Sequence, residues 1–147
     1  MKKVLMLVLP VLAAALVIPA AFAGNVSANK TTGTVSYNNP WTGDATTISF
    51  VAQDLGSNGA KGNMSYTDST GRSYAGTVIA AHVTDAHNAD FTVKVTSSTF
   101  DNTPVGTEVP LVVTDNGQSG VGNDTISWMG INLGPLTGGN IQVHFNG

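Results

Sequence analysis

Oxygen-bearing side chains are concentrated in one segment of the chain, residues 114–125, which reads TDNGQSGVGNDT. Its Asp115, Asn116 and Asp124 supply carboxylate and amide oxygens, the ligands that a hard cation such as Ca²⁺ prefers. The glycines between them would let the backbone turn so that carbonyl groups converge. The spacing is not that of an EF-hand loop, which also carries a Glu at its twelfth position. The segment therefore predicts either a calcium site or a hairpin loop in which Asp124 caps neighbouring backbone.

Imidazoles and carboxylates form a second polar group, at His82, Asp85, His87 and Asp90. Side chains of these types can hold zinc. Because the segment reads as strand, turn and strand, His82 and Asp90 should face each other across a hairpin, with His87 at its tip. A solvated turn explains the same residues without a metal, so both interpretations stay open.

The types and spacing of the residues give little support for a catalytic site. The chain has no Cys, and Ser119 stands in a GQSG segment that lacks the strand-to-helix elbow of a hydrolase nucleophile. Glycosidases need two carboxylates at a set separation, whereas Glu108 is the only Glu and no Asp pair is singled out by its spacing. We therefore predict no catalytic residue and no enzyme activity, with a hydrolase as the lesser alternative.

The tryptophans are candidates for contact with a ligand, because an exposed aromatic face can stack on a sugar ring. Trp41 follows the turn-forming residues Asn38-Asn39-Pro40, so it should lie in a loop, as a binding platform or as a plug over the end of the fold. Trp128 shares its face with Ile126, which favours a place in the core. Trp41 is therefore the predicted ligand-binding residue.

The elements that must position these residues are strands. Apolar residues alternate with polar ones along several short runs, and polar turns separate the runs. The apolar residues of the runs are Ile48/Phe50/Ala52, Phe91/Val93/Val95, Val109/Leu111/Val113, Ile126/Trp128 and Ile141/Val143/Phe145. Helical spacing is almost absent after residue 23. We therefore expect one all-β domain over residues 24–147, an antiparallel β-sandwich of about eight strands with immunoglobulin-like or jelly-roll-like topology.

The first 23 residues have the layout of a secretory signal peptide: Lys2 and Lys3, an apolar run, and Ala21-Phe22-Ala23 before Gly24. Cleavage there would leave no apolar segment long enough to span a membrane. The chain of 147 residues carries a formal charge of −3, and removal of the leader would leave 4 basic against 9 acidic residues. Such a protein has no basic field for nucleic acid.

These features together predict a secreted extracellular or cell-envelope binding or structural module, whose ligand or surface partner is unknown. One alternative is a carbohydrate-binding domain that uses Trp41. Another is a self-associating fibre subunit in which residues 24–37 pair with the sheet edge of the next molecule. No cofactor is expected apart from the calcium considered above.

Several motifs carry a resemblance to a known family. They are Ile48-Ser49-Phe50, Gly59–Gly62 with Tyr66 and Asp68, Ala89-Asp90-Phe91, Asp115-Asn116-Gly117 followed by Gly120, Gly122 and Asp124, and the ending Leu136–His144. Through them the chain resembles the post-COAP domain family of small exported bacterial proteins over roughly residues 48–144. Asn123, inserted before Asp124, and a longer excursion over residues 99–108 depart from the family pattern. The resemblance implies a secreted β-domain and no known active site.

Overall fold

The computed structural model of the chain describes residues 28–117 and 123–147, and almost all of its regular structure is β-strand. A single 3-10 turn, η1 (Gly56–Asn58), connects two of the strands. The strands are β1 (Asn29–Asn38), β2 (Ala45–Asp54), β3 (Ala60–Asp68), β4 (Ser73–Val83), β5 (Asn88–Ser98), β6 (Glu108–Thr114), β7 (Thr125–Trp128), β8 (Ile131–Asn132) and β9 (Leu136–His144).

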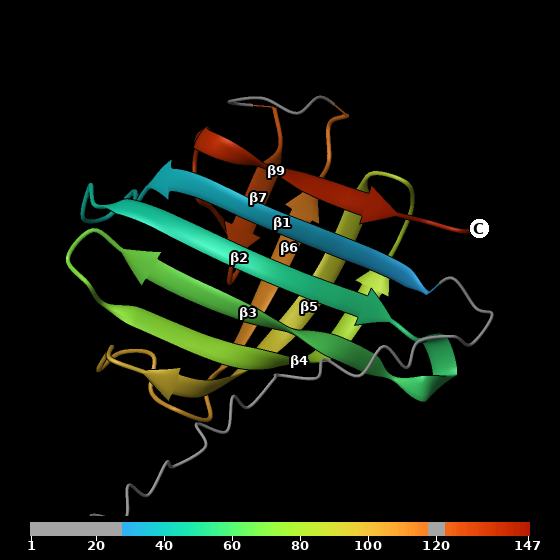
Figure 1. Cartoon of the computed structure of the whole chain (residues 1–147), viewed down its shortest axis with the longest axis horizontal. Helices are drawn as coiled ribbons and strands as arrows, with labels where there is room; N and C mark the ends of the chain where they lie inside the picture. The colour runs from blue at the N-terminus through green and yellow to red at the C-terminus, as the bar shows by residue number, and fades with distance from the viewer. Residues whose placement is uncertain (1–27, 118–122) are drawn as a thin grey trace, which may run out of the picture.

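The nine strands form one antiparallel sheet in the order β8-β7-β6-β5-β4-β3-β2-β1-β9. Strands β1 to β8 follow one another as hairpins, and β9 then returns to pair with β1 (Figure 1). Strand β1 is therefore hydrogen-bonded on both edges, to β2 and to β9. A fibre in which residues 29–37 add to a neighbouring molecule would require β1 to leave its own sheet.

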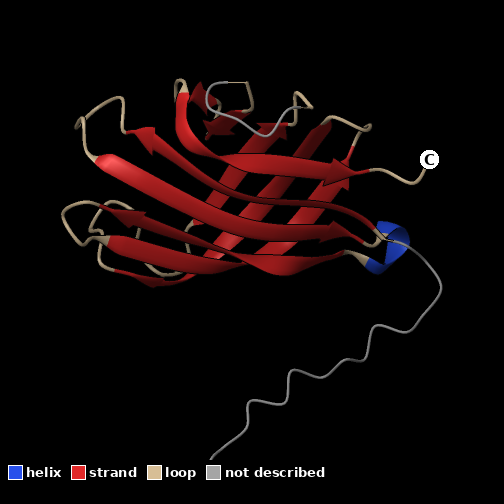
Figure 2. Ribbon diagram, turned by 45° about the horizontal axis from the view of Figure 1, so that its top comes forward, coloured by secondary structure: helices blue, strands red, loops and turns tan. Residues whose placement is uncertain are grey.

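The prediction of an all-β, antiparallel domain is confirmed, but the strands do not divide into the two sheets of a sandwich. Pairing continues from β4 to β5 through register shifts at residues 75/76 and 78/80. Such bulges sharpen the local twist and bend of a sheet. The single sheet thereby curls into a half-barrel, in which β9 and β1–β3 lie across β5–β7 (Figures 1 and 2).

The core fills the inside of this half-barrel, as the alternation along the strands predicts. Ile48, Phe50 and Ala52 are buried from β2, and the predicted apolar residues of β5 and β6 are buried opposite them. The prediction was wrong at the end of the chain, where Phe145 is 41% exposed. Strand β9 ends at His144, opposite Lys30 near the start of β1, so Phe145 lies beyond the part of the sheet that covers the core.

Two carboxylates link the loop between β6 and β7 to the outer edge of β9. Asp124 is buried and accepts a hydrogen bond from the Ile141 backbone N–H at 2.7 Å. Asp115 accepts one from the Val143 backbone N–H at 3.1 Å. We call Asp115 and Asp124 the carboxylate clasp. Because an edge strand exposes unpaired N–H groups, the clasp satisfies two donors of β9 and ties the two ends of the curled sheet together.

The proposed leader, residues 1–23, and residues 118–122 lie outside the described part of the chain. Within residues 28–117 and 123–147, no helix has the length and apolar character that crossing a membrane requires.

Candidate functional site

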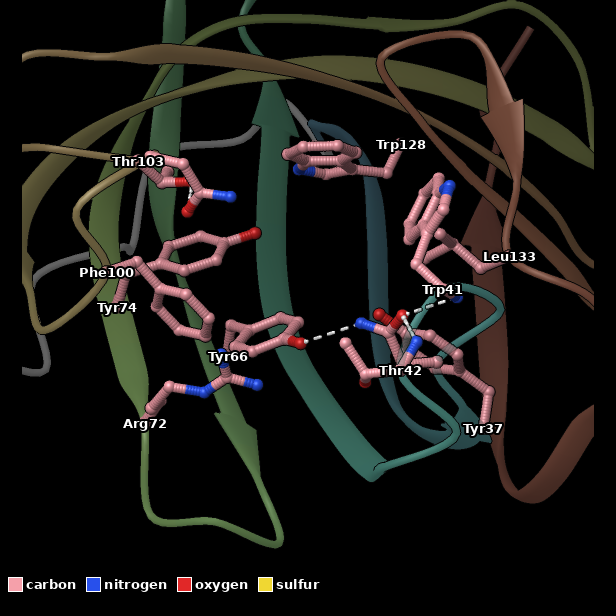
Figure 3. A pocket seen from close by; sticks show the side chains of 12 residues that line it. Tyr37, Trp41, Thr42, Tyr66, Arg72, Tyr74, Phe100, Thr103, Trp128 and Leu133 are labelled. Carbon is pink, nitrogen blue, oxygen red and sulfur yellow. Dashed lines mark hydrogen bonds between the residues drawn. The ribbon is translucent and has the colours of Figure 1, made fainter.

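One end of the half-barrel opens into a cavity of about 310 Å³ whose wall is dominated by aromatic rings (Figure 3). We call it the aromatic cup. Among the described residues, six aromatic side chains line it together with five polar residues and one leucine: Tyr37, Trp41, Tyr66, Tyr74, Phe100 and Trp128, with Asn39, Thr42, Arg72, Asn102, Thr103 and Leu133. Open ends of curved β-sheets are a common place for small-molecule sites, and this volume is within the range of about 300–1,000 Å³ that such sites occupy.

The rings of the aromatic cup hold one another in place. Tyr66 and Tyr74 face each other across β3 and β4 and stack with ring centroids 4.8 Å apart and planes 11° apart. Phe100 meets the Tyr66 ring edge-on at 5.3 Å. Offset stacks and edge-on contacts are the favoured arrangements of aromatic pairs. One wall of the cup is therefore rigid before any ligand arrives.

Trp41 stands on the rim of the cup and is 56% exposed. Its loop is ordered by Asn39, whose side-chain oxygen accepts hydrogen bonds from the backbone N–H groups of Trp41 and Thr42 at 2.9 and 3.2 Å. The Trp41 ring meets the Trp128 ring edge-on, with centroids 6.0 Å apart. The structure thus places Trp41 in a loop with an exposed face, as predicted, and leaves its role as a binding platform a prediction.

Trp128 shares a face with the fully buried Ile126, as predicted, and packs against the core. It also lines the cup, because β7 ends there. Met129 follows in a two-residue turn with Gly130, and the φ angles of the two residues are 50° and 81°. A left-handed conformation costs a residue with a side chain about 1–2 kcal/mol. Backbone strain of this kind is often found beside ligand sites.

Of the described residues that line the cup, Arg72 alone is charged, and its charge is already paired. Its guanidinium lies 2.8 Å from an Asp68 oxygen and 3.2 Å from an Asp44 oxygen. Burial alone would raise the pKa of Asp68, but hydrogen bonds from Thr70 and Arg72 outweigh it and hold the pKa below the usual range. The guanidinium also lies 4.9 Å from the centroid of the Phe100 ring, a favourable cation–π position.

Within the part of the chain that the structure describes, two buried polar atoms in the wall of the cup have no hydrogen-bond partner, the Tyr74 hydroxyl and the Trp128 indole N–H. Burial, together with the nearby Tyr66, raises the pKa of Tyr74 well above its usual value, so the hydroxyl keeps its proton. The neighbouring Trp128 N–H acts in the opposite direction and lowers this pKa, although the two groups do not meet the geometry of a hydrogen bond. Unpaired buried polar groups are rare in proteins and call for a physical reason.

Tyr37 is also buried in the wall of the cup. Burial, followed by the neighbouring Tyr66 and Tyr74, raises the pKa of Tyr37 far above its usual value. The cup therefore presents neutral hydroxyls from Tyr37 and Tyr74 throughout the physiological pH range.

The structure brings Asp115, Asn116 and Asp124 together, but the carboxylate oxygens of the two aspartates already bind N–H groups of the protein. Asp124 accepts hydrogen bonds from Asn116 N and Ile141 N, and Asp115 from Gly117 N and Val143 N. The Asn116 side-chain amide donates to the Asn123 carbonyl. The hairpin-loop interpretation accounts for these contacts, and calcium binding stays a prediction.

His82 and Asp90 pair across the β4–β5 hairpin as predicted, with Nδ1 and Oδ1 3.6 Å apart. His87 lies at the turn, where its Nδ1 is 2.9 Å from the Asp115 carbonyl oxygen. Asp85 accepts hydrogen bonds from the backbone N–H groups of His87 and Asn88. Across the parts of the chain that the structure describes, no three His, Cys, Asp or Glu side chains gather as a metal site.

The sequence contains a signal for the aromatic cup that residue-by-residue inspection misses. Alternate turns of an antiparallel meander lie at the same end of the sheet. The first turn contains Trp41 and follows Tyr37, and the third lies between Tyr66 and Tyr74. The fifth turn contains Phe100, and the seventh follows Trp128. The second, fourth and sixth turns contain no aromatic residue. Aromatic residues beside every other turn therefore indicate an aromatic site at one end of the sheet.

No family model, curated protein or solved structure matches the chain. The resemblance to the post-COAP domain family stays a prediction for that reason. The geometry of the aromatic cup is accordingly the basis on which a function can be proposed.

Proposed function

We propose that this protein is an exported binding module that takes a small ligand into the aromatic cup. The observation that supports the proposal is the concave, aromatic-lined opening at one end of the half-barrel, with Trp41 exposed on its rim. Ligand sites are typically concave and lined by aromatic and apolar side chains with a few polar groups that fix orientation. The cup has this composition, and its stacked rings need little rearrangement to receive a ligand.

The chemistry of the cup favours binding over catalysis. Catalysis by proton transfer or nucleophilic attack needs a titratable group that can reach the substrate. The residues that line the cup include no carboxylate and no imidazole, and the Arg72 guanidinium is held by Asp44 and Asp68. The neutral tyrosine hydroxyls of the wall supply hydrogen bonds rather than a base.

Export remains part of the proposal because of the layout of residues 1–23. If the leader is removed after Ala23, the secreted protein begins at Gly24. Mass spectrometry of the protein recovered from the periplasm or medium of a bacterial expression host should then show a chain of residues 24–147. Recovery of the chain with its first 23 residues intact, in the membrane fraction, would contradict export as a free protein.

Truncation of Trp41 should weaken ligand binding by about tenfold or more, because an aromatic anchor commonly contributes about 1.4 kcal/mol or more. The measurement is isothermal titration calorimetry of residues 24–147 and of Trp41→Ala against one panel of probes. The panel contains neutral oligosaccharides of glucose, galactose, mannose and N-acetylglucosamine, a galacturonic acid trimer, choline and indole. At least one probe should bind to the unsubstituted protein.

Phe145→Ala is the matched control, since Phe145 is an exposed aromatic residue that does not line the cup. It should bind each probe as the unsubstituted protein does. Equal loss of affinity in Trp41→Ala and Phe145→Ala would show that aromatic residues act non-specifically. Absence of binding to every probe would count against a ligand site in the cup.

A further inference from the structure

We infer that the ligand of the aromatic cup is an uncharged carbohydrate, held through its hydroxyl groups by Tyr74 and Trp128. This inference rests on the proposed function, since it names the class of ligand for the same site. Three properties of the cup support it: the unpaired polar atoms of its wall, its balance of charge, and the arrangement of its rings.

The unpaired polar atoms determine what the ligand must offer. The indole N–H of Trp128 can only donate a hydrogen bond, whereas the Tyr74 hydroxyl can donate and accept. Tyr74 is 5% exposed, so its hydroxyl has little access to bulk water. A buried polar group without a partner destabilises the protein, because its desolvation is not compensated. A ligand hydroxyl can accept from Trp128 and also bond to Tyr74, which satisfies both groups, whereas an aromatic hydrocarbon or a quaternary ammonium satisfies neither.

The charges around the cup disfavour an ionised ligand. The Arg72 guanidinium is paired with Asp68 and Asp44, so it does not present an unbalanced positive charge to an acid. The same guanidinium lies over the Phe100 ring, where a second cation would be repelled. A carboxylate ligand would approach the two aspartates, and an ammonium ligand would approach the arginine. A neutral ligand avoids both interactions.

The rings are arranged for a ligand that has an apolar face and a polar edge. Trp41 stands at the rim with more than half of its surface exposed, whereas the unpaired polar atoms belong to Tyr74 and Trp128 in the wall (Figure 3). A sugar ring presents C–H groups on its faces and hydroxyls around its circumference. Its face can cover the exposed Trp41 ring while a hydroxyl at its edge reaches the wall. Aromatic side chains with a polar atom suit such ligands.

The test removes each unpaired polar atom and keeps an aromatic ring at the position. Tyr74→Phe should bind the neutral oligosaccharide that binds best about 3- to 10-fold more weakly, the loss of one hydrogen bond. Trp128→Phe, which also removes ring surface that meets Trp41, should weaken binding by at least as much. Urea unfolding without ligand should show Tyr74→Phe to be at least as stable as the unsubstituted protein, because it removes a buried group that has no partner. Phe145→Ala, at an exposed aromatic residue outside the cup, is again the comparison and should bind this oligosaccharide as the unsubstituted protein does.

The outcomes separate this inference from the proposed function. If a neutral oligosaccharide binds, and binds more weakly to Trp41→Ala, Tyr74→Phe and Trp128→Phe, the result supports both the proposed function and the carbohydrate inference. If choline, indole or the galacturonic acid trimer binds through Trp41 and no neutral oligosaccharide binds below a dissociation constant of about 5 mM, roughly −3 kcal/mol, the cup is a ligand site and the carbohydrate inference is wrong. Oligosaccharide binding that is unchanged in both wall variants would overturn the role of the unpaired atoms. If no probe binds, both proposals fail.

Discussion

Gly139→Ala is expected to destabilise the protein by about 3 kcal/mol or more, or to prevent it from folding. A Cβ atom at residue 139 would lie 2.0 Å from the Thr34 carbonyl oxygen and 2.7 Å from the Val35 Cα. Both atoms belong to the backbone of β1, which is held on its other edge by β2 and has little freedom to move away. The φ angle of Gly139 is also +90°, a conformation that residues with side chains rarely adopt. Urea unfolding followed by circular dichroism gives the free-energy difference.

Gly138→Ala is the matched control, because it introduces the same methyl group one residue earlier. Its Cβ would approach only the Ser36 Cβ, at 4.0 Å, which is ordinary van der Waals contact. The free energy of unfolding should change by no more than about 1 kcal/mol. This range includes the effect of the Gly-to-Ala substitution on the unfolded chain. Similar free energies of unfolding for the two variants would contradict the close approach of β9 to β1.

Asp124→Ala is expected to lower the free energy of unfolding by about 2–4 kcal/mol. Asp124 is 1% exposed and accepts hydrogen bonds from Ile141 N at 2.7 Å and Asn116 N at 2.9 Å. The substitution leaves both donors without the carboxylate, and Ile141 is fully buried, so water cannot readily take its place. It also removes one of the two contacts between the β6–β7 loop and β9, while the contact of Asp115 with Val143 N remains. The measurement is again urea unfolding, with hydrogen exchange of the Ile141 amide as a local readout.

Asp101→Ala is the control for charge, since Asp101 is an exposed carboxylate in the β5–β6 loop. Its free energy of unfolding should stay within about 0.5 kcal/mol of the unsubstituted protein. Faster exchange of the Ile141 amide is expected in Asp124→Ala and not in Asp101→Ala. Equal stability of the two variants would show that the carboxylate clasp does not hold the ends of the sheet together.

The strands could be predicted from the sequence to a large extent, because their evidence is local. Alternation at Phe91/Val93/Val95 and at Val109/Leu111/Val113 identifies strands and the face that each one buries. The pairing of His82 with Asp90 also followed, because a short hairpin determines its own register. Phe145 shows where this reasoning ends: it continues the alternation of β9, but nothing in the pattern shows that the strand stops before it.

The candidate site was harder to predict, because it is assembled from residues that are far apart in the chain. Trp41 was identified from its loop, whereas no local pattern singled out Tyr66, Tyr74 or Phe100 as site residues. Asp115 and Asp124 were identified as residues with oxygen ligands. Their role in the carboxylate clasp was not, because it depends on β9, in which Ile141 lies 17 positions after Asp124. Such contacts depend on how the sheet curls, and no local pattern encodes that curvature.

By itself, the sequence determined that this chain forms an antiparallel all-β domain, that runs such as 91–95 and 109–113 lie in strands, and that Trp41 lies in a loop, because alternation and turn formation depend on neighbours in the chain. The tertiary structure alone decided that the strands form one curled sheet rather than two packed sheets. It also decided that aromatic residues beside alternate turns meet in one cup, and that Asp115 and Asp124 bind the edge of β9. These features depend on the bulges between β4 and β5 and on the return of β9 to β1, which bring distant residues together.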